Sequence, residues 1–161
     1  MSRTRIVSWS DPAAAAAQAQ TMSGLEALLA MIEGRISAPP IIELLGIKML
    51  TAEPGRVTMG LQIGEHLYNP IGSVHGGVAA TLLDSVMGCA VHSSLPIGRI
   101  YSTLEIKISY LRPMTQALGM ITAEGNVISL GRKADFAEGR ITGPDGKIYA
   151  TGSTTCAVWD L

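Results

Sequence analysis

Charged residues, cysteines and long apolar runs are all scarce in this chain, and each scarcity excludes a class of protein. Only 16% of residues are charged and the formal net charge is −1, so there is no electrostatic case for a nucleic-acid-binding surface or for attraction to an acidic membrane. The two cysteines, Cys89 and Cys156, lack the close spacing of metal ligands. We interpret both as small core residues in a reducing compartment, with a disulfide as the less favoured alternative.

The apolar runs that do occur are too short or too interrupted for a membrane protein. The most apolar stretch, residues 77–91, carries a carboxylate, Asp84, near its centre, whereas a membrane span needs about 20 largely uncharged residues. Near the N-terminus, Asp11-Pro12 separates two early arginines from a weakly hydrophobic alanine tract, which is wrong for a signal peptide. We therefore expect a cytoplasmic protein that neither enters a membrane nor binds one.

What the chain has in quantity is apolar residues. They make up 47% of the 161 residues, which suits one domain of ordinary size with a substantial core. With so few charges, part of the surface should also be apolar, and soluble monomers avoid large apolar patches. The composition therefore indicates self-association.

The order of elements predicts an α+β fold. An N-terminal helical arm covers residues 1–39: its first helix starts at the cap Asp11-Pro12, and Pro39-Pro40 ends the arm. The main domain, residues 40–161, follows the arm. Its expected elements are a helical turn at 41–45, strands at 47–52 and 56–63, a long helix at about 74–94, and strands at 100–111, 116–129, 132–142 and 147–159. Strands grouped on both sides of a lone helix favour an antiparallel sheet wrapped around it. Such a sheet covers only one side of an apolar helix, so we expect a second copy of the chain to cover the other.

The long helix has no polar face. Valine, leucine, alanine, methionine and cysteine occupy nearly every angular position, which places the helix in the interior. Asp84 is the one charge between residues 77 and 91. An unpaired carboxylate is costly to bury, so Asp84 either accepts structural hydrogen bonds or serves a function. These residues alone favour neither interpretation.

The stretch around this helix resembles a known family. The pattern N-P-x-G-x-x-H-G-G-x-x-A-x-L-x-D, spanning residues 69–84, is similar to the signature of hotdog-fold acyl-CoA thioesterases of the phenylacetate-degradation type. Segments 103–106, 110–113, 131–132 and 145–147 are also similar, so the resemblance covers about residues 40–158 and leaves out the arm. It implies a sheet curled around the helix, homodimers joined edge to edge, frequent tetramers, and an active site shared between protomers.

The resemblance also implies a role for each motif residue. Asp84 matches the carboxylate that activates water as general base or attacks the thioester directly. Gly76 matches the residue whose backbone N–H donates to the thioester oxygen; the alternative is that it only permits a tight turn. His75 matches a histidine near the thioester, or else it satisfies backbone groups. Asn69 matches an asparagine that positions water or polarises the carbonyl, with turn formation as its alternative. Thr103 matches a residue that helps hold the water, but by itself it is only a β-branched strand residue.

Coenzyme A carries phosphates, which need cations. Arg112, Arg132 and Lys133 are the best matches, although each is equally well explained as a solvated strand end. The favoured function is hydrolysis of an acyl- or aroyl-CoA thioester without a metal or other cofactor. Two alternatives stay open: a hotdog dehydratase acting on hydroxyacyl thioesters, and a non-catalytic acyl-CoA-binding module.

Overall fold

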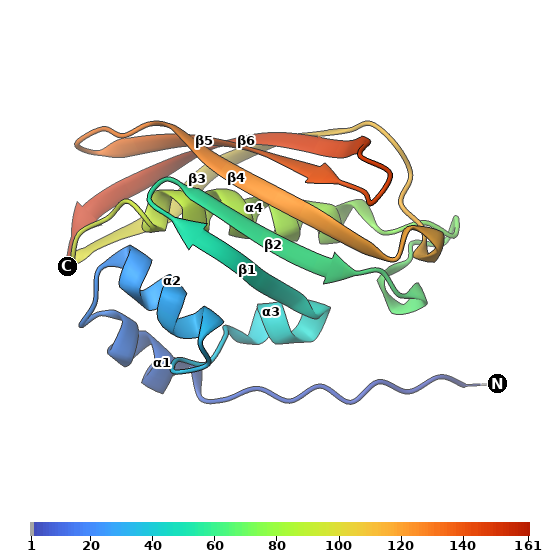
Figure 1. The fold of residues 1–161 in the computed structure, drawn as a ribbon, viewed down its shortest axis with the longest axis horizontal. Coiled ribbons are helices and arrows are strands. Elements are labelled where there is room, and N and C mark those ends of the chain that lie inside the picture. The colour runs from blue at the N-terminus through green and yellow to red at the C-terminus, as the bar shows by residue number, and fades with distance from the viewer. Residues whose placement is uncertain (1) are drawn as a thin grey trace.

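The computed structural model describes residues 2–161, which form one curled sheet with a long helix, α4, on its concave face (Figure 1). In this part of the chain the sheet has six strands in the order β1-β2-β4-β5-β6-β3, and every neighbouring pair is antiparallel. The strands are β1 Ile47–Glu53, β2 Arg56–Gln62, β3 Arg99–Tyr110, β4 Met120–Ser129, β5 Ala134–Thr142 and β6 Ile148–Asp160. The helices are α1 Pro12–Ala19, α2 Gly24–Ile32, α3 Pro40–Leu45 and α4 Gly76–His92. The predicted α+β fold is confirmed.

The expected strand at residues 116–129 is wrong at its start. Gln116–Leu118 form a turn of 3₁₀-helix, and β4 begins only at Met120. Gly119, with a φ of 69°, redirects the chain between the two, a backbone conformation that side-chain-bearing residues rarely adopt. The apolar pattern of this stretch did not reveal the turn.

Glycines in the sheet let α4 pack closely against it. Gly125, Gly139 and Gly152 are paired across β4, β5 and β6 and form a row under the helix. A β-carbon at Gly125 would lie 2.4 Å from the Val86 carbonyl oxygen, and one at Gly139 would lie 2.8 Å from the Met87 side chain. The absence of these side chains therefore sets the distance between helix and sheet, and the buried residues of α4 fill the core. These are Ala79, Leu82, Leu83, Val86, Met87, Gly88, Ala90 and Val91.

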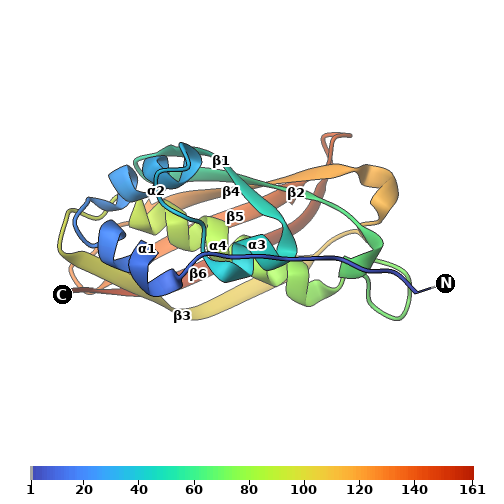
Figure 2. The same cartoon turned by 90° about the horizontal axis from the view of Figure 1, so that it is seen from below.

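Helix α2 of the N-terminal arm lies beside β1 (Figure 2). Helix α2 has a capping box formed by Ser23 and Glu26, and its Leu28 is buried within the main core. The Gly24 N–H donates to the Leu95 carbonyl at 3.0 Å, which ties the start of α2 to the chain just beyond α4. The arm is therefore packed on the domain in the single chain. Whether it is a separate unit ending at residue 39 stays a prediction.

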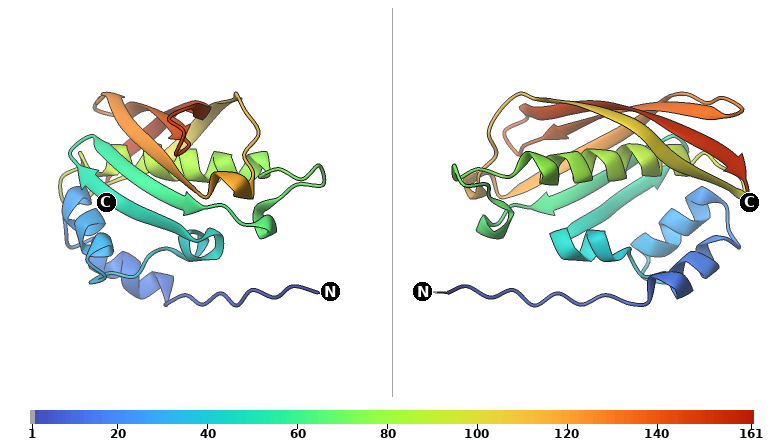
Figure 3. Two further views of the ribbon diagram at one scale, coloured as in Figure 1. Left: turned by 45° about the vertical axis from the view of Figure 1, so that its right-hand side comes forward. Right: turned by 180° about the vertical axis from the view of Figure 1, so that it is seen from behind.

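Strand β3 forms one edge of the sheet and runs alongside α4, as the view from behind shows (Figure 3). It is twelve residues long, and its pairing with β6 shifts register between Thr103 and Glu105. This β-bulge leaves Leu104 66% exposed. A long edge strand with exposed apolar side chains is unusual in a protein that works as a monomer.

Candidate active site

Asp84 lies on the side of α4 that faces β3. Its side chain is half-buried, and its Oδ1 accepts a hydrogen bond from the Thr103 hydroxyl at 2.9 Å. Within residues 2–161, no hydrogen bond reaches its second oxygen, Oδ2. Because an ionised carboxylate can accept several hydrogen bonds, Asp84 is held at one oxygen and available at the other. This pairing is the first chemically notable feature of the site.

The N-terminal turn of α4 is the second chemically notable feature of the site. His75 is the N-cap: its Nδ1 accepts from the Gly77 N–H at 2.9 Å, and its carbonyl accepts from the Val78 N–H at 2.9 Å. In the neutral imidazole the proton is therefore on Nε2. The Gly76 N–H has no hydrogen-bond acceptor anywhere in the described chain. A free N–H at the positive end of a helix is an anion-binding group, and here the capping histidine leaves that of Gly76 unused.

Gly76 opens onto a cavity of about 300 Å³. Asn69 and Arg112, two other residues singled out from the sequence, also line this cavity. The Tyr110 hydroxyl donates to the Gly76 carbonyl at 3.0 Å and closes one wall. Sequence reasoning missed this role of Tyr110, although the residue belongs to the 110–113 segment that carries part of the resemblance.

The Asn69 side chain is engaged in its own loop. Its Oδ1 accepts from the backbone N–H groups of Ile71 at 3.1 Å and Ser73 at 3.2 Å, and its Nδ2 donates to the Ser73 hydroxyl. These contacts are an Asx turn, which is the turn-forming role considered for Asn69. The loop leads into the N-cap of α4, so the hydrogen bonds of Asn69 fix the loop that borders the cavity.

A single chain does not bring all the predicted residues together. Asp84 is eight residues after Gly76 in the same helix, which corresponds to about 12 Å along the axis. Arg112 follows the end of β3, whereas Arg132 and Lys133 lie beside its beginning: the Arg132 carbonyl accepts from Arg99 at 2.7 Å. These two ends are about 36 Å apart along the strand. The acid and the amide are thus separated, and so are the cations.

The side chains around Asp84 are strongly desolvated. Burial, with a smaller effect of the Asp84 charge, raises the pKa of the Cys89 thiol to about 12. Burial also raises the pKa of the Tyr101 phenol well above its usual value. Both groups are therefore neutral at physiological pH. Cys89 and Cys156 are free thiols, as the sequence predicts.

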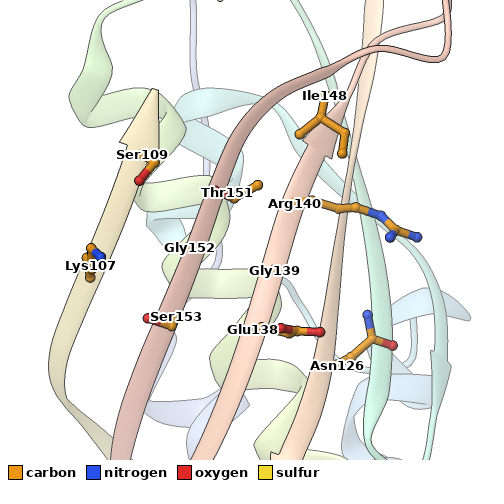
Figure 4. A pocket seen from close by; sticks show the side chains of 10 residues that line it. All are labelled: Lys107, Ser109, Asn126, Glu138, Gly139, Arg140, Ile148, Thr151, Gly152 and Ser153. Atoms are coloured by element: carbon orange, nitrogen blue, oxygen red, sulfur yellow. The ribbon is translucent and has the colours of Figure 1, made fainter. Parts of the chain in front are cut away.

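A groove of about 390 Å³ lies elsewhere, on the outer face of the sheet (Figure 4). Gly139 and Gly152 form its floor, and Lys107, Glu138 and Arg140 are the charged side chains around it. It contains none of the residues that the motif singles out. The sheet separates it from Asp84 and Gly76, so we do not assign the chemistry to it.

No helix among residues 2–161 is long and apolar enough to cross a membrane.

Comparison with known proteins identifies the family. A family model described as "Thioesterase superfamily" matches residues 71–150. A Halobacterium salinarum protein with a provisional esterase assignment is 32% identical over 130 residues, covering 76% of this chain and 84% of that protein. The 1,4-dihydroxy-2-naphthoyl-CoA hydrolase of Listeria monocytogenes is 28% identical over 116 residues, covering 72% and 93%.

A solved structure is similar over most of its length. It is a phenylacetic acid degradation-related protein from Ralstonia eutropha, 27% identical, with a TM-score of 0.73 and coverage of 81% of this chain and 98% of that one. The antiparallel sheet and its long central helix agree with this solved structure. The chain therefore belongs to the thioesterase superfamily and has the hotdog fold.

Proposed function

We propose that this thioesterase hydrolyses an acyl- or aroyl-CoA thioester to the free acid and coenzyme A, at a site built by two copies of the chain. The observation that carries the proposal is the pairing of a half-buried acid, Asp84, held by Thr103, with an unused helix-terminal amide at Gly76. Thioester hydrolysis needs these two components: a group that delivers or activates the nucleophile, and a donor for the oxyanion.

Asp84 supplies the first component. With Oδ1 fixed by Thr103, Oδ2 is free either to accept a proton from an attacking water or to attack the thioester carbon itself. In the first route the water oxygen bonds to the carbonyl carbon as its proton passes to Asp84. In the second route a mixed anhydride forms, and water then hydrolyses it. The carbon–sulfur bond breaks and the thiol leaves in both routes: from the tetrahedral intermediate in the first, and as the mixed anhydride forms, before its hydrolysis, in the second.

Gly76 supplies the second component. Gly76 lies at the N-terminus of α4 and lines a cavity, and the absent side chain lets a substrate carbonyl approach its N–H closely. As the thioester carbonyl becomes tetrahedral, its oxygen gains negative charge and its bond to this N–H strengthens. An interaction that is stronger in the transition state than in the ground state accelerates the reaction.

The separation of Asp84 from Gly76 supports a shared site. Leu104, Ile106 and Tyr110 of the edge strand β3 are 66%, 36% and 56% exposed. Antiparallel pairing of two β3 strands about a two-fold axis would cover them. If the axis passes midway between residues 103 and 110, the level of Thr103 in one chain lies beside the level of Tyr110 in the other. Asp84 of each chain then comes close to Gly76 of the other.

The same pairing gathers the cations. Arg112 of one chain would lie opposite the Tyr101 level of the other, and Tyr101 pairs with Val158, whose N–H donates to the Lys133 carbonyl. Arg132 and Lys133 of one chain therefore approach Arg112 of the other, and the three form a basic rim for the phosphates of coenzyme A. That the acyl group is carried by coenzyme A agrees with the name of the Listeria relative.

The test is a panel of acetyl-, hexanoyl-, lauroyl-, benzoyl-, phenylacetyl- and 3-hydroxybutyryl-CoA, with detection of thiol and of enoyl product, together with the mass of the assembly in solution. We expect thiol release from at least one ester by the wild-type chain and none above background by Asp84→Asn. We also expect the mass of a dimer or, as the resemblance implies, a tetramer. Saturable binding of these esters without thiol release, or conversion of a hydroxyacyl-CoA to an enoyl product, would contradict the proposal.

A further inference from the structure

Tyr101 lies next to Asp84, and it has no role in the reaction proposed above. It is two residues before Thr103 on β3, so the two side chains point to the same face of the strand, toward α4. Gly88 is four residues after Asp84, so these two positions are adjacent on one side of the helix. Two residues along a strand and four residues along a helix each span about 6 Å. Strand and helix are thus in register: Thr103 contacts Asp84, and Tyr101 contacts Gly88.

Gly88 is what lets the phenol lie there. A β-carbon at residue 88 would be 2.8 Å from the Tyr101 hydroxyl oxygen and 2.8 Å from its ring carbon Cε2. The hydroxyl therefore rests on the helix backbone one turn beyond Asp84. The His92 ring, one turn further along α4, lies with its centroid 5.6 Å from that of Tyr101. Gly88 and His92 therefore form the part of α4 on which the phenol packs.

The phenol is a hydrogen-bond donor. Burial, followed by the neighbouring thiols and Asp84, raises its pKa, so it stays protonated at any pH at which a thioester is assayed. Its neighbour within the chain is the Cys89 thiol, whose sulfur is a weak acceptor. A protonated hydroxyl with only a weak partner lies within one helical turn of an acceptor-only carboxylate that has one oxygen free.

We propose that Tyr101 is a further catalytic residue: its hydroxyl donates a hydrogen bond to the attacking water, which in turn donates to Oδ2 of Asp84. Thr103 orients the carboxylate and Tyr101 orients the water, so the water's lone pair is directed at the thioester carbon. This inference rests on the proposed function and assigns Asp84 the general-base route. No covalent bond to Tyr101 forms, and the proton of the water passes to Asp84.

The first test compares Tyr101→Phe with the wild type in the full chain. The substrate is whichever of hexanoyl-CoA and benzoyl-CoA the wild type hydrolyses faster. We expect kcat to fall about tenfold, the usual effect of losing one hydrogen bond, while KM changes by less than about twofold. Tyr149→Phe is the matched control, because the Tyr149 hydroxyl bonds to Asp145 in the β5–β6 turn and should leave both constants unchanged.

Gly88→Ala gives a second test. The added methyl group would displace the phenol, so kcat should fall as in Tyr101→Phe. The double variant should be no slower than the slower single variant, because both changes remove the same hydrogen bond. Wild-type kcat in Tyr101→Phe, or losses that multiply in the double variant, would overturn the inference. The proposed function would still stand if Asp84→Asn is inactive, and would fail on its own if that variant hydrolyses normally.

Discussion

Helix α4 has one side that packs against the concave face of the sheet and another that faces the edge strand β3. On the sheet side, Leu83, Val86 and Met87 are completely buried and a row of glycines lies beneath them. On the β3 side, Asp84 is half-buried and its neighbours are hydroxyl groups and a glycine. The same helix therefore anchors the core and carries the acid. Changes on the sheet side should reduce stability, and changes on the β3 side should reduce turnover.

The largest expected effect on turnover comes from Asp84→Asn. The amide has nearly the same shape but cannot accept the proton or attack, so we expect kcat to fall about a thousandfold. Circular dichroism and thermal melting should show a folded protein. Ser85→Ala, the adjacent half-buried position on α4, is the control and should retain normal turnover. Near-normal turnover in a folded Asp84→Asn variant would remove the assigned role.

Gly76 allows the backbone amide itself to be tested. It is the first residue of α4, a position that tolerates proline, and His75 before it has the extended backbone that proline requires. Gly76→Pro removes the N–H, whereas Gly76→Ala keeps it. Both variants add a β-carbon 3.2 Å from the Tyr110 ring, so they crowd this side chain about equally. We expect kcat to be about a hundredfold lower in Gly76→Pro than in Gly76→Ala. Equal rates in the two variants would mean that the amide does not bind the oxyanion.

On the sheet side, Gly125→Ala should lower stability and not turnover. Its methyl group would be forced against the Val86 carbonyl, and overpacking of this kind costs about 1–3 kcal/mol of the free energy of unfolding. Gly152→Ala is the matched control, because its β-carbon would lie 3.3 Å from the flexible end of Met87 and no closer than 3.2 Å to a backbone atom, the Lys107 carbonyl oxygen. Urea unfolding should rank Gly125→Ala below Gly152→Ala. The same kcat per folded molecule is expected for both, and a loss of kcat would show that the two sides of α4 are not separate in function.

The smallest of these effects is expected from Thr103→Val. Valine preserves the shape and the strand preference of threonine but removes the donor to Asp84, so we expect kcat to fall about tenfold. Steady-state kinetics at saturating substrate measure this directly. Unchanged kcat would show that Asp84 keeps its orientation without Thr103.

The contrast between the two sides of α4 also explains how much the sequence could predict. Apolar periodicity and turn residues identified the long helix and the six strands, because both are local signals. The pattern does not show the turn at Gln116–Leu118, which depends on Gly119 adopting a positive φ. The sequence also does not predict the glycine row, because its three members lie on different strands and come together only when those strands pair.

The sequence proposes a set of site residues but not how they are arranged. The motif named Asp84, Gly76 and Thr103, and the contact between Thr103 and Asp84 shows that two of them belong together. The contact of Tyr101 with Gly88 depends on the register between a helix and a strand that are far apart in the chain, and no local pattern encodes that register. The separation of Asp84 from Gly76, by contrast, follows from their eight-residue spacing within one predicted helix.

The most direct test of the shared site is a mixed dimer of Asp84→Asn and Gly76→Pro chains, purified with two different tags. If each site takes its acid from one chain and its amide from the other, one of the two sites in this dimer is intact. Turnover should then recover to about half that of the wild-type dimer, although each parent is nearly inactive. If the mixed dimer is no more active than its parents, acid and amide act within one chain and the account is wrong.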